Sequence, residues 1–104
     1  MSLRVHFEPE ADTEYQQAGV WYEGRREGLG LEFFDEVDAT IRRILDFPRL
    51  GAAVPRVPAD LPVRRLAVRR FPYHVIYLET AKELRILAVA HDRRRPGYWQ
   101  TRLR

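Results

Sequence analysis

The sequence predicts an α+β fold, in which an N-terminal strand and a helical hairpin precede a three-stranded antiparallel meander and a short C-terminal helix or tail. Helical periodicity between residues 9 and 46 and three strand-like runs between residues 63 and 91 indicate this β-α-α-β-β-β order. The chain has 104 residues, the usual length of one compact domain, so we expect residues 1–104 to form a single domain.

The N-terminal strand is predicted from Leu3, Val5 and Phe7, which alternate with polar residues. Pro9 then favours the first turn of a helix, because the missing N–H of proline is not needed there. The apolar residues that follow recur at helical spacing, with Trp21 beside them: Ala11, Tyr15, Ala18 and Tyr22. This face is expected to point into the core.

A second helix is predicted to complete a hairpin with the first. Glycines between residues 24 and 30 interrupt the first periodic pattern, and helical spacing resumes at Phe34 before Pro48 ends it. Residues 47–62 contain four of the seven prolines, and we interpret them as a surface loop. Strands are then expected over residues 63–70, 73–79 and 83–91, with a turn at residues 80–82.

The last two predicted strands are apolar on both faces, so both faces of the sheet need cover. Strict alternation would place Leu84, Ile86, Ala88 and Ala90 on one face of the last strand, and Leu87 and Val89 on the other. The helical hairpin can cover one side of the sheet. The other side is left to the C-terminal segment, another copy of the chain or a partner protein.

Composition excludes several functions. No cysteine is present, so disulfides and thiolate zinc sites cannot form, and we expect a cytoplasmic protein. No apolar run reaches the length of a signal peptide core or a membrane span. Phosphate-binding glycine loops, the serine hydrolase elbow and the zinc protease helix motif are missing too, so we expect no cofactor and no metal.

Charge divides the chain into two parts of opposite sign. Residues 1–46 hold five arginines and eleven acids, a net charge of −6. Residues 47–104 hold thirteen basic residues and four acids, a net charge of +9. Such asymmetry indicates that one part of the protein meets a polyanion.

The densest group of functional residue types lies at residues 91–102, directly after the last predicted strand. His91 can transfer a proton near neutral pH, three arginines at residues 93–95 concentrate positive potential, and Tyr98 and Trp99 offer rings for base stacking. These residue types suit nucleic-acid binding or metal-independent RNA cleavage. The structural alternative is a solvated arginine run followed by two aromatic anchors for a terminal helix.

A second basic cluster brackets the first strand of the meander. Alternation places Arg65 and Arg69 on one face of this strand, and Arg64 and Arg70 on the other. The four arginines therefore cannot line one groove. Arg70, near the predicted strand end, could bend toward the C-terminal cluster.

Taken in order along the chain, these residues resemble the RelE/ParE superfamily of toxins from bacterial toxin–antitoxin pairs. The similar segments are Pro9-Glu10-Ala11, Trp21-Tyr22, Gly30 to Phe34, Phe47-Pro48, Arg64-Arg65-Leu66, residues 71–77 and residues 86–91, followed by Arg94, Pro96, Tyr98, Trp99 and Arg102. The resemblance implies a toxin that a cognate antitoxin holds inactive by covering part of its surface.

The RelE-like branch implies an endoribonuclease that cuts ribosome-bound mRNA, and this is our leading interpretation. Its catalytic residues would be Arg70, His91 and Tyr98. Substrate binding would fall to Arg69, Arg93, Arg94, Arg95, Trp99 and Arg102. The sequence departs from the nucleases at His74, where they commonly carry arginine, and in lacking their loop lysines.

Two alternatives remain open. The ParE-like branch implies inhibition of DNA gyrase by a protein that is not a nuclease. The second alternative is a non-toxic relative that keeps the antitoxin-binding surface. The sequence therefore leaves open whether the protein is an enzyme.

Overall fold

The computed structural model describes residues 3–58 and 61–103 of the chain and has the predicted α+β architecture. Its elements are β1 (Arg4–Phe7), α1 (Pro9–Arg25), α2 (Leu29–Asp46), β2 (Ala52–Ala53), β3 (Val63–Ala67), β4 (Tyr73–Glu79), β5 (Glu83–His91) and a 3₁₀ turn, η1 (Gln100–Leu103). The strands form one sheet in the order β1-β5-β4-β3-β2. The β1 strand is parallel to β5, and all other neighbours are antiparallel.

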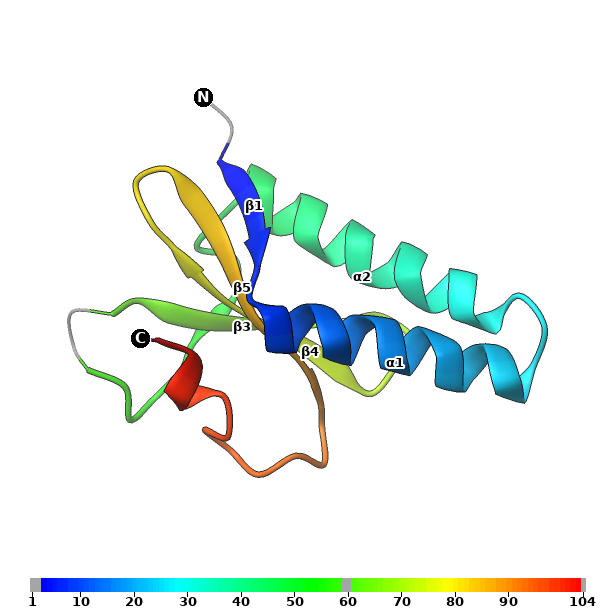
Figure 1. The fold of residues 1–104 in the computed structure, drawn as a ribbon. Helices are drawn as coiled ribbons and strands as arrows, with labels where there is room; N and C mark the ends of the chain where they lie inside the picture. The colour runs from blue at the N-terminus through cyan, green and yellow to red at the C-terminus, as the bar shows by residue number, and fades with distance from the viewer. Residues whose placement is uncertain (1–2, 59–60, 104) are drawn as a thin grey trace.

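The helical hairpin packs across one side of the sheet, and the C-terminal turn lies on the other (Figure 1). The first helix begins at Pro9, as predicted. The second begins at Leu29, ahead of the apolar spacing that resumes at Phe34, because a side chain from α1 caps it. A carboxylate of Glu23 accepts hydrogen bonds from the backbone N–H groups of Gly28, at 2.9 Å, and Gly30, at 3.0 Å.

The two helices lie in close contact at Gly30, which leads to the first expected result. A Cβ atom at Gly30 would lie 2.5 Å from the carbonyl oxygen of Gly19, so Gly30→Ala should lower the free energy of unfolding by about 1–3 kcal/mol. The matched control is Gly24→Ala on α1, where a Cβ atom meets nothing within 4 Å and alanine should add roughly 0.5–1 kcal/mol. Urea denaturation compares the two variants, and equal stabilities would contradict this close packing.

The predicted core face of α1 is confirmed, because all four of its residues pack in the cluster between the helices and the sheet. Ala11 and Ala18 are buried, and Tyr22 packs at 5.3 Å from the ring of Phe33. Trp21, predicted beside this face and not on it, is 58% exposed. It points away from the core because a neighbour in the helix is rotated by about 100° from Tyr22.

The faces of β5 differ from strict alternation because the strand contains a β-bulge at Leu87. Tyr77 pairs with Ile86 and Ile76 with Ala88, so Leu87 has no partner of its own across the ladder. The helix-covered face holds Leu84, Ile86 and Val89, while the second face holds Leu87, Ala88 and Ala90. The expected grouping by simple alternation was therefore correct up to Leu87 and wrong from Ala88 to Ala90.

The second face of the sheet is covered by this chain itself. Trp99 is 2% exposed and packs in a cluster with Leu87 and Val63. Apolar residues of the segment between β2 and β3 contribute to the same cluster. Of the three alternatives for this face, the structure thus uses the C-terminal segment, together with part of the predicted loop.

That loop, residues 47–62, also contains the short edge strand β2, which the sequence did not predict among so many prolines. The following strand, β3, ends at Ala67 and not at Arg70 as predicted. The chain turns there, and Arg70 adopts a left-handed backbone conformation with φ of 71°. A strand cannot continue through that conformation.

Candidate functional site at the C-terminal segment

One carboxylate, that of Glu14 in α1, accepts several of the hydrogen bonds that hold the C-terminal segment to the rest of the protein. Arg102 donates to it twice, from Nη1 to Oε1 at 2.9 Å and from Nη2 to Oε2 at 3.1 Å. The Tyr98 hydroxyl donates to Oε2 at 2.6 Å, and the backbone N–H of Val89 donates to Oε1 at 3.1 Å. Arg102 also donates to the carbonyl oxygen of Leu87 at 3.0 Å. These bonds satisfy the edge of β5 beyond its short pairing with β1.

Tyr98 is held as a neutral hydrogen-bond donor in this arrangement. Burial raises the pKa of its hydroxyl, and the hydrogen bond to Glu14 and the charge of that carboxylate raise it further. For Arg102, burial alone would lower the pKa, but Glu14 raises it overall. The guanidinium of Arg94 lies 4.1 Å from the centre of the Tyr98 ring, and that of Arg102 lies 5.0 Å from it, so two cations contact this ring.

Alkaline pH is expected to destabilise the folded chain through Tyr98 and Tyr15. The pKa of Tyr15 is likewise raised, by burial and by its hydrogen bond to Asp38. Above the ordinary tyrosine pKa of about 10, the unfolded chain releases protons that the folded chain keeps, so stability present below that pH falls as pH rises. An ultraviolet absorbance titration should show that Tyr15 and Tyr98 are among the tyrosines that ionise only on unfolding. Ionisation of every tyrosine at the ordinary pKa in a folded chain would contradict the structure.

His91 ends β5 with one ring nitrogen already in use. Its Nδ1 accepts a hydrogen bond from the backbone N–H of Arg93 at 3.0 Å, and its ring meets the Tyr73 ring edge-on at 5.0 Å between centres. Only Nε2 remains for contact with a ligand. A second histidine, His74, lies on the neighbouring strand and forms a 2.7 Å hydrogen bond with Asp92.

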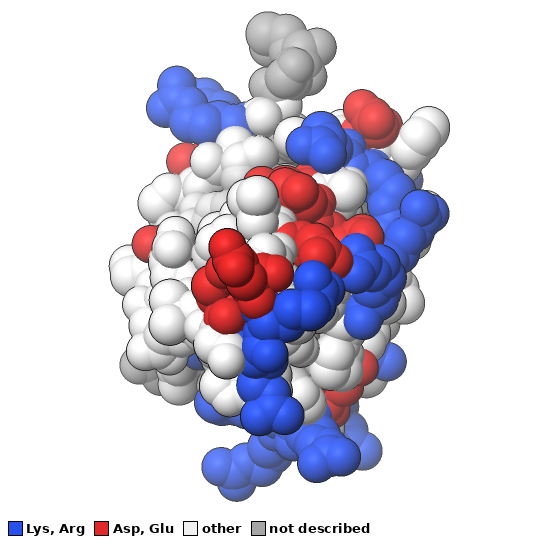
Figure 2. All heavy atoms as spheres, turned by 90° about the vertical axis from the view of Figure 1, so that its right-hand side faces the viewer, with Lys and Arg blue, Asp and Glu red and all other residues white. Residues whose placement is uncertain are grey.

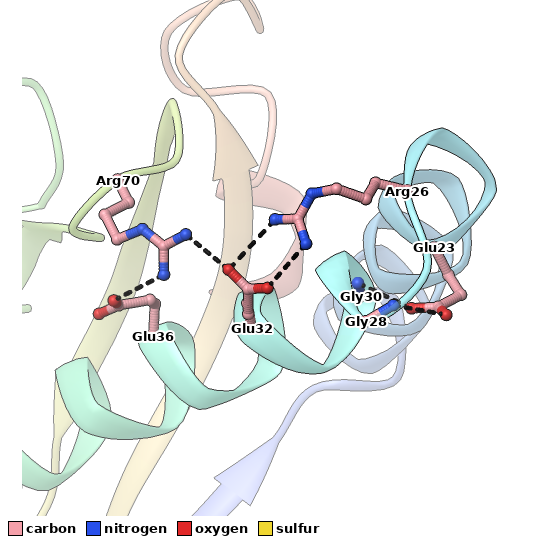
Figure 3. Close-up of polar contacts among 7 residues, drawn as sticks. All are labelled: Glu23, Arg26, Gly28, Gly30, Glu32, Glu36 and Arg70. Carbon is pink, nitrogen blue, oxygen red and sulfur yellow. Dashed lines mark hydrogen bonds and ion pairs between the residues drawn. The ribbon is translucent and has the colours of Figure 1, made fainter.

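Arg70 lies against α2 and not in the C-terminal cluster toward which we expected it to bend (Figure 3). Its Nη2 is 2.6 Å from Oε1 of Glu32, and its Nη1 is 3.6 Å from Oε2 of Glu36. Glu32 also accepts from Arg26, and these two arginines lower its pKa, with the Arg70 hydrogen bond the larger cause. Arg70 therefore belongs to an exposed ion-pair network that joins the turn before β4 to the helical hairpin.

The remaining predicted site residues divide into two groups. Trp99 is buried under the sheet, so its ring cannot stack on a ligand. Arg69, Arg93 and Arg95 are exposed and form no ion pair within residues 3–58 and 61–103. The structure thus joins Arg94, Tyr98 and Arg102 around Glu14, places His91 beside the segment, and leaves three arginines in solvent.

No clear signal in the sequence pointed to Glu14. It is one of several acids on α1, and its spacing falls beside the predicted apolar face. Its role depends on the bulge in β5 and on residues more than seventy positions away, which helical periodicity does not report.

No group of three or more possible metal-ligating side chains occurs in the described part of the chain. None of the described helices is long and apolar enough to span a membrane.

A family model for the ParE toxin of the type II toxin–antitoxin system parDE matches residues 5–96. The chain belongs to the ParE toxin family. This confirms the resemblance inferred from its ordered motifs, and it makes a cognate antitoxin the partner of this toxin.

The fold of this ParE toxin is similar to that of a solved structure described as the chromosomal ParDE TA system from P. aeruginosa. The TM-score is 0.67 with 17% sequence identity, over 86% of this chain and 96% of that one. At this identity the likeness supports the fold alone. No significant match was found among curated proteins.

Proposed function

We propose that this toxin stops bacterial growth in the cytoplasm by inhibiting DNA gyrase, and that it is not an mRNA endoribonuclease. The family assignment favours the ParE-like branch, which the sequence interpretation kept as the alternative. The single observation that carries the proposal is the hydrogen bonding of Tyr98 and Arg102 to Glu14. These hydrogen bonds engage Tyr98 and Arg102, two of the residues on which the nuclease interpretation depended.

RNA cleavage without a metal requires a group that removes a proton from the ribose hydroxyl, a cation for the phosphate and an acid for the leaving oxygen. Tyr98 is a poor proton donor or acceptor here, because its raised pKa and its bond to Glu14 keep it protonated. Arg70 faces two glutamates of α2. His91 retains only Nε2, without a cation or acid joined to it by hydrogen bonds in the described residues.

A test in cells distinguishes the two targets by whether DNA synthesis or protein synthesis stops first. The chain is induced without its antitoxin, and incorporation of labelled precursors into DNA and into protein is followed from the first minutes. Gyrase inhibition should break chromosomal DNA and stop DNA synthesis while protein synthesis continues. Early loss of protein synthesis with intact DNA would count against the proposal. Unchanged growth with folded chain present would favour the non-toxic relative instead.

A further inference from the structure

Some arginines of this fold form ion pairs with carboxylates, and others do not. Arg26, Arg70, Arg85 and Arg102 each contact a glutamate. Other arginines are exposed and contact no carboxylate in the part of the chain that the structure describes. Five of these lie around the side of the sheet that the helices do not cover: Arg56, Arg65, Arg69, Arg93 and Arg95. We refer to these five as the basic surface. Their charge is open to a partner.

The basic surface frames the side of the sheet that the helices leave free. Arg65 pairs with Ile76, which belongs to the apolar cluster on that side. The carbonyl oxygen of Arg56 accepts a hydrogen bond from Gln100 in η1, and that of Arg95 accepts one from the N–H of Tyr98. These contacts place both arginines next to the C-terminal segment.

The other two arginines come from adjacent loops at the end of the sheet. The backbone N–H of Asp92 donates to the carbonyl oxygen of Pro72 at 2.8 Å, which joins the loop after β5 to the turn before β4. Arg93 is the residue directly after Asp92, and Arg69 stands three residues before Pro72. Asp92 is itself bound to His74. In Figure 2, acidic side chains gather at the centre of the view and a group of basic side chains at its lower end, where Figure 1 places the loop after β5.

The aromatic residues beside the basic surface indicate which polyanion fits. Single-stranded nucleic acid is usually held by stacking its bases on exposed aromatic rings. Here Trp99 is 2% exposed and the Tyr98 ring is covered by Arg94, so neither ring is free to stack a base. Arginines without free aromatic rings beside them suit the regularly spaced phosphates of a duplex.

We propose that the basic surface binds the phosphate backbone of duplex DNA without reading its sequence. The inference rests on the proposed function, because the proposed target, gyrase, acts on duplex DNA. Binding of this kind depends on counterion release, so the logarithm of the affinity should fall linearly with the logarithm of salt concentration. The slope reports how many arginines meet phosphates.

The test measures fluorescence anisotropy of a short labelled DNA duplex of arbitrary sequence against the purified chain over a range of salt concentrations. The variant Arg65→Ala/Arg93→Ala should bind more weakly, with a salt slope lower by about 0.9 for each phosphate that the variant no longer neutralises. The control, Arg25→Ala/Arg42→Ala, removes the same charge from exposed sites on α1 and α2 and should keep the wild-type slope. Circular dichroism checks that both variants are folded.

Equally weakened binding in the two variants would overturn the inference, since net charge alone would then explain binding. Tighter binding of single-stranded RNA than of the duplex would overturn it too. A chain that inhibits gyrase but does not bind free duplex would refute only this inference. A chain that binds the duplex through the basic surface but leaves gyrase untouched would support it and refute the proposed target.

Discussion

Replacing Glu14 with alanine is expected to lower the free energy of unfolding by about 3–5 kcal/mol, the usual effect when one partner of a buried ion pair is removed. The side chain of Arg102 is 10% exposed and that of Glu14 is 20% exposed. Without the carboxylate, the Arg102 guanidinium, the Tyr98 hydroxyl and the Val89 N–H are each deprived of an acceptor. Water reaches this site only in part, so it cannot fully replace those bonds.

Two further variants make this result specific to the carboxylate. Glu14→Gln keeps an acceptor oxygen but removes the charge, and it should fall between wild type and Glu14→Ala. Glu10→Ala, an exposed position on the same helix, should change stability by less than about 0.5 kcal/mol. Urea denaturation followed by circular dichroism measures all three. If Glu14→Ala unfolds at the same urea concentration as Glu10→Ala, the carboxylate does not hold the C-terminal segment.

Replacing Trp99 with alanine should have an effect of similar size, roughly 3–5 kcal/mol, because it opens a cavity in the second apolar cluster. Trp99 is 2% exposed and packs against residues of three strands, β3, β4 and β5. It closes the side of the sheet that no helix covers. Its removal should therefore expose apolar surface and favour aggregation as well as unfolding.

The chain provides its own control for this experiment, since Trp21 is its only other tryptophan and is 58% exposed. Trp21→Ala should change stability by no more than about 0.5 kcal/mol. The fluorescence of the two variants assigns the signals, with blue-shifted emission expected from the Trp99 ring that remains in Trp21→Ala. Equal destabilisation by the two substitutions would contradict the observed burial.

Much of the fold could be predicted because its elements depend on local pattern. The strands over Tyr73–Glu79 and Glu83–His91 and the helix start at Pro9 follow from alternation, turn residues and proline geometry. The strand β2 could not be predicted, since two alanines carry no alternation of their own. The bulge at Leu87 was also unpredictable, because one extra residue reverses the faces without changing the apolar composition.

The candidate site was harder to predict than the fold. The sequence indicated which C-terminal residues matter, and Tyr98, Trp99 and Arg102 do form one unit. It could not indicate that Glu14 would bind two of them, or that Arg70 would turn toward Glu32, because both contacts join distant segments. A set of residue types suited to catalysis therefore suggested a nuclease. The hydrogen bonds that engage those residues favour an inhibitor that acts by binding.

The most direct test of this account incubates the purified toxin with gyrase, ATP and supercoiled plasmid, and in parallel with ribosomes stalled on a defined mRNA. Denaturation of the first reaction should release linear DNA in proportion to the toxin added, because trapped gyrase leaves both strands cut. The mRNA of the second reaction should stay intact. Cleaved mRNA together with a plasmid that remains uncut would contradict the account.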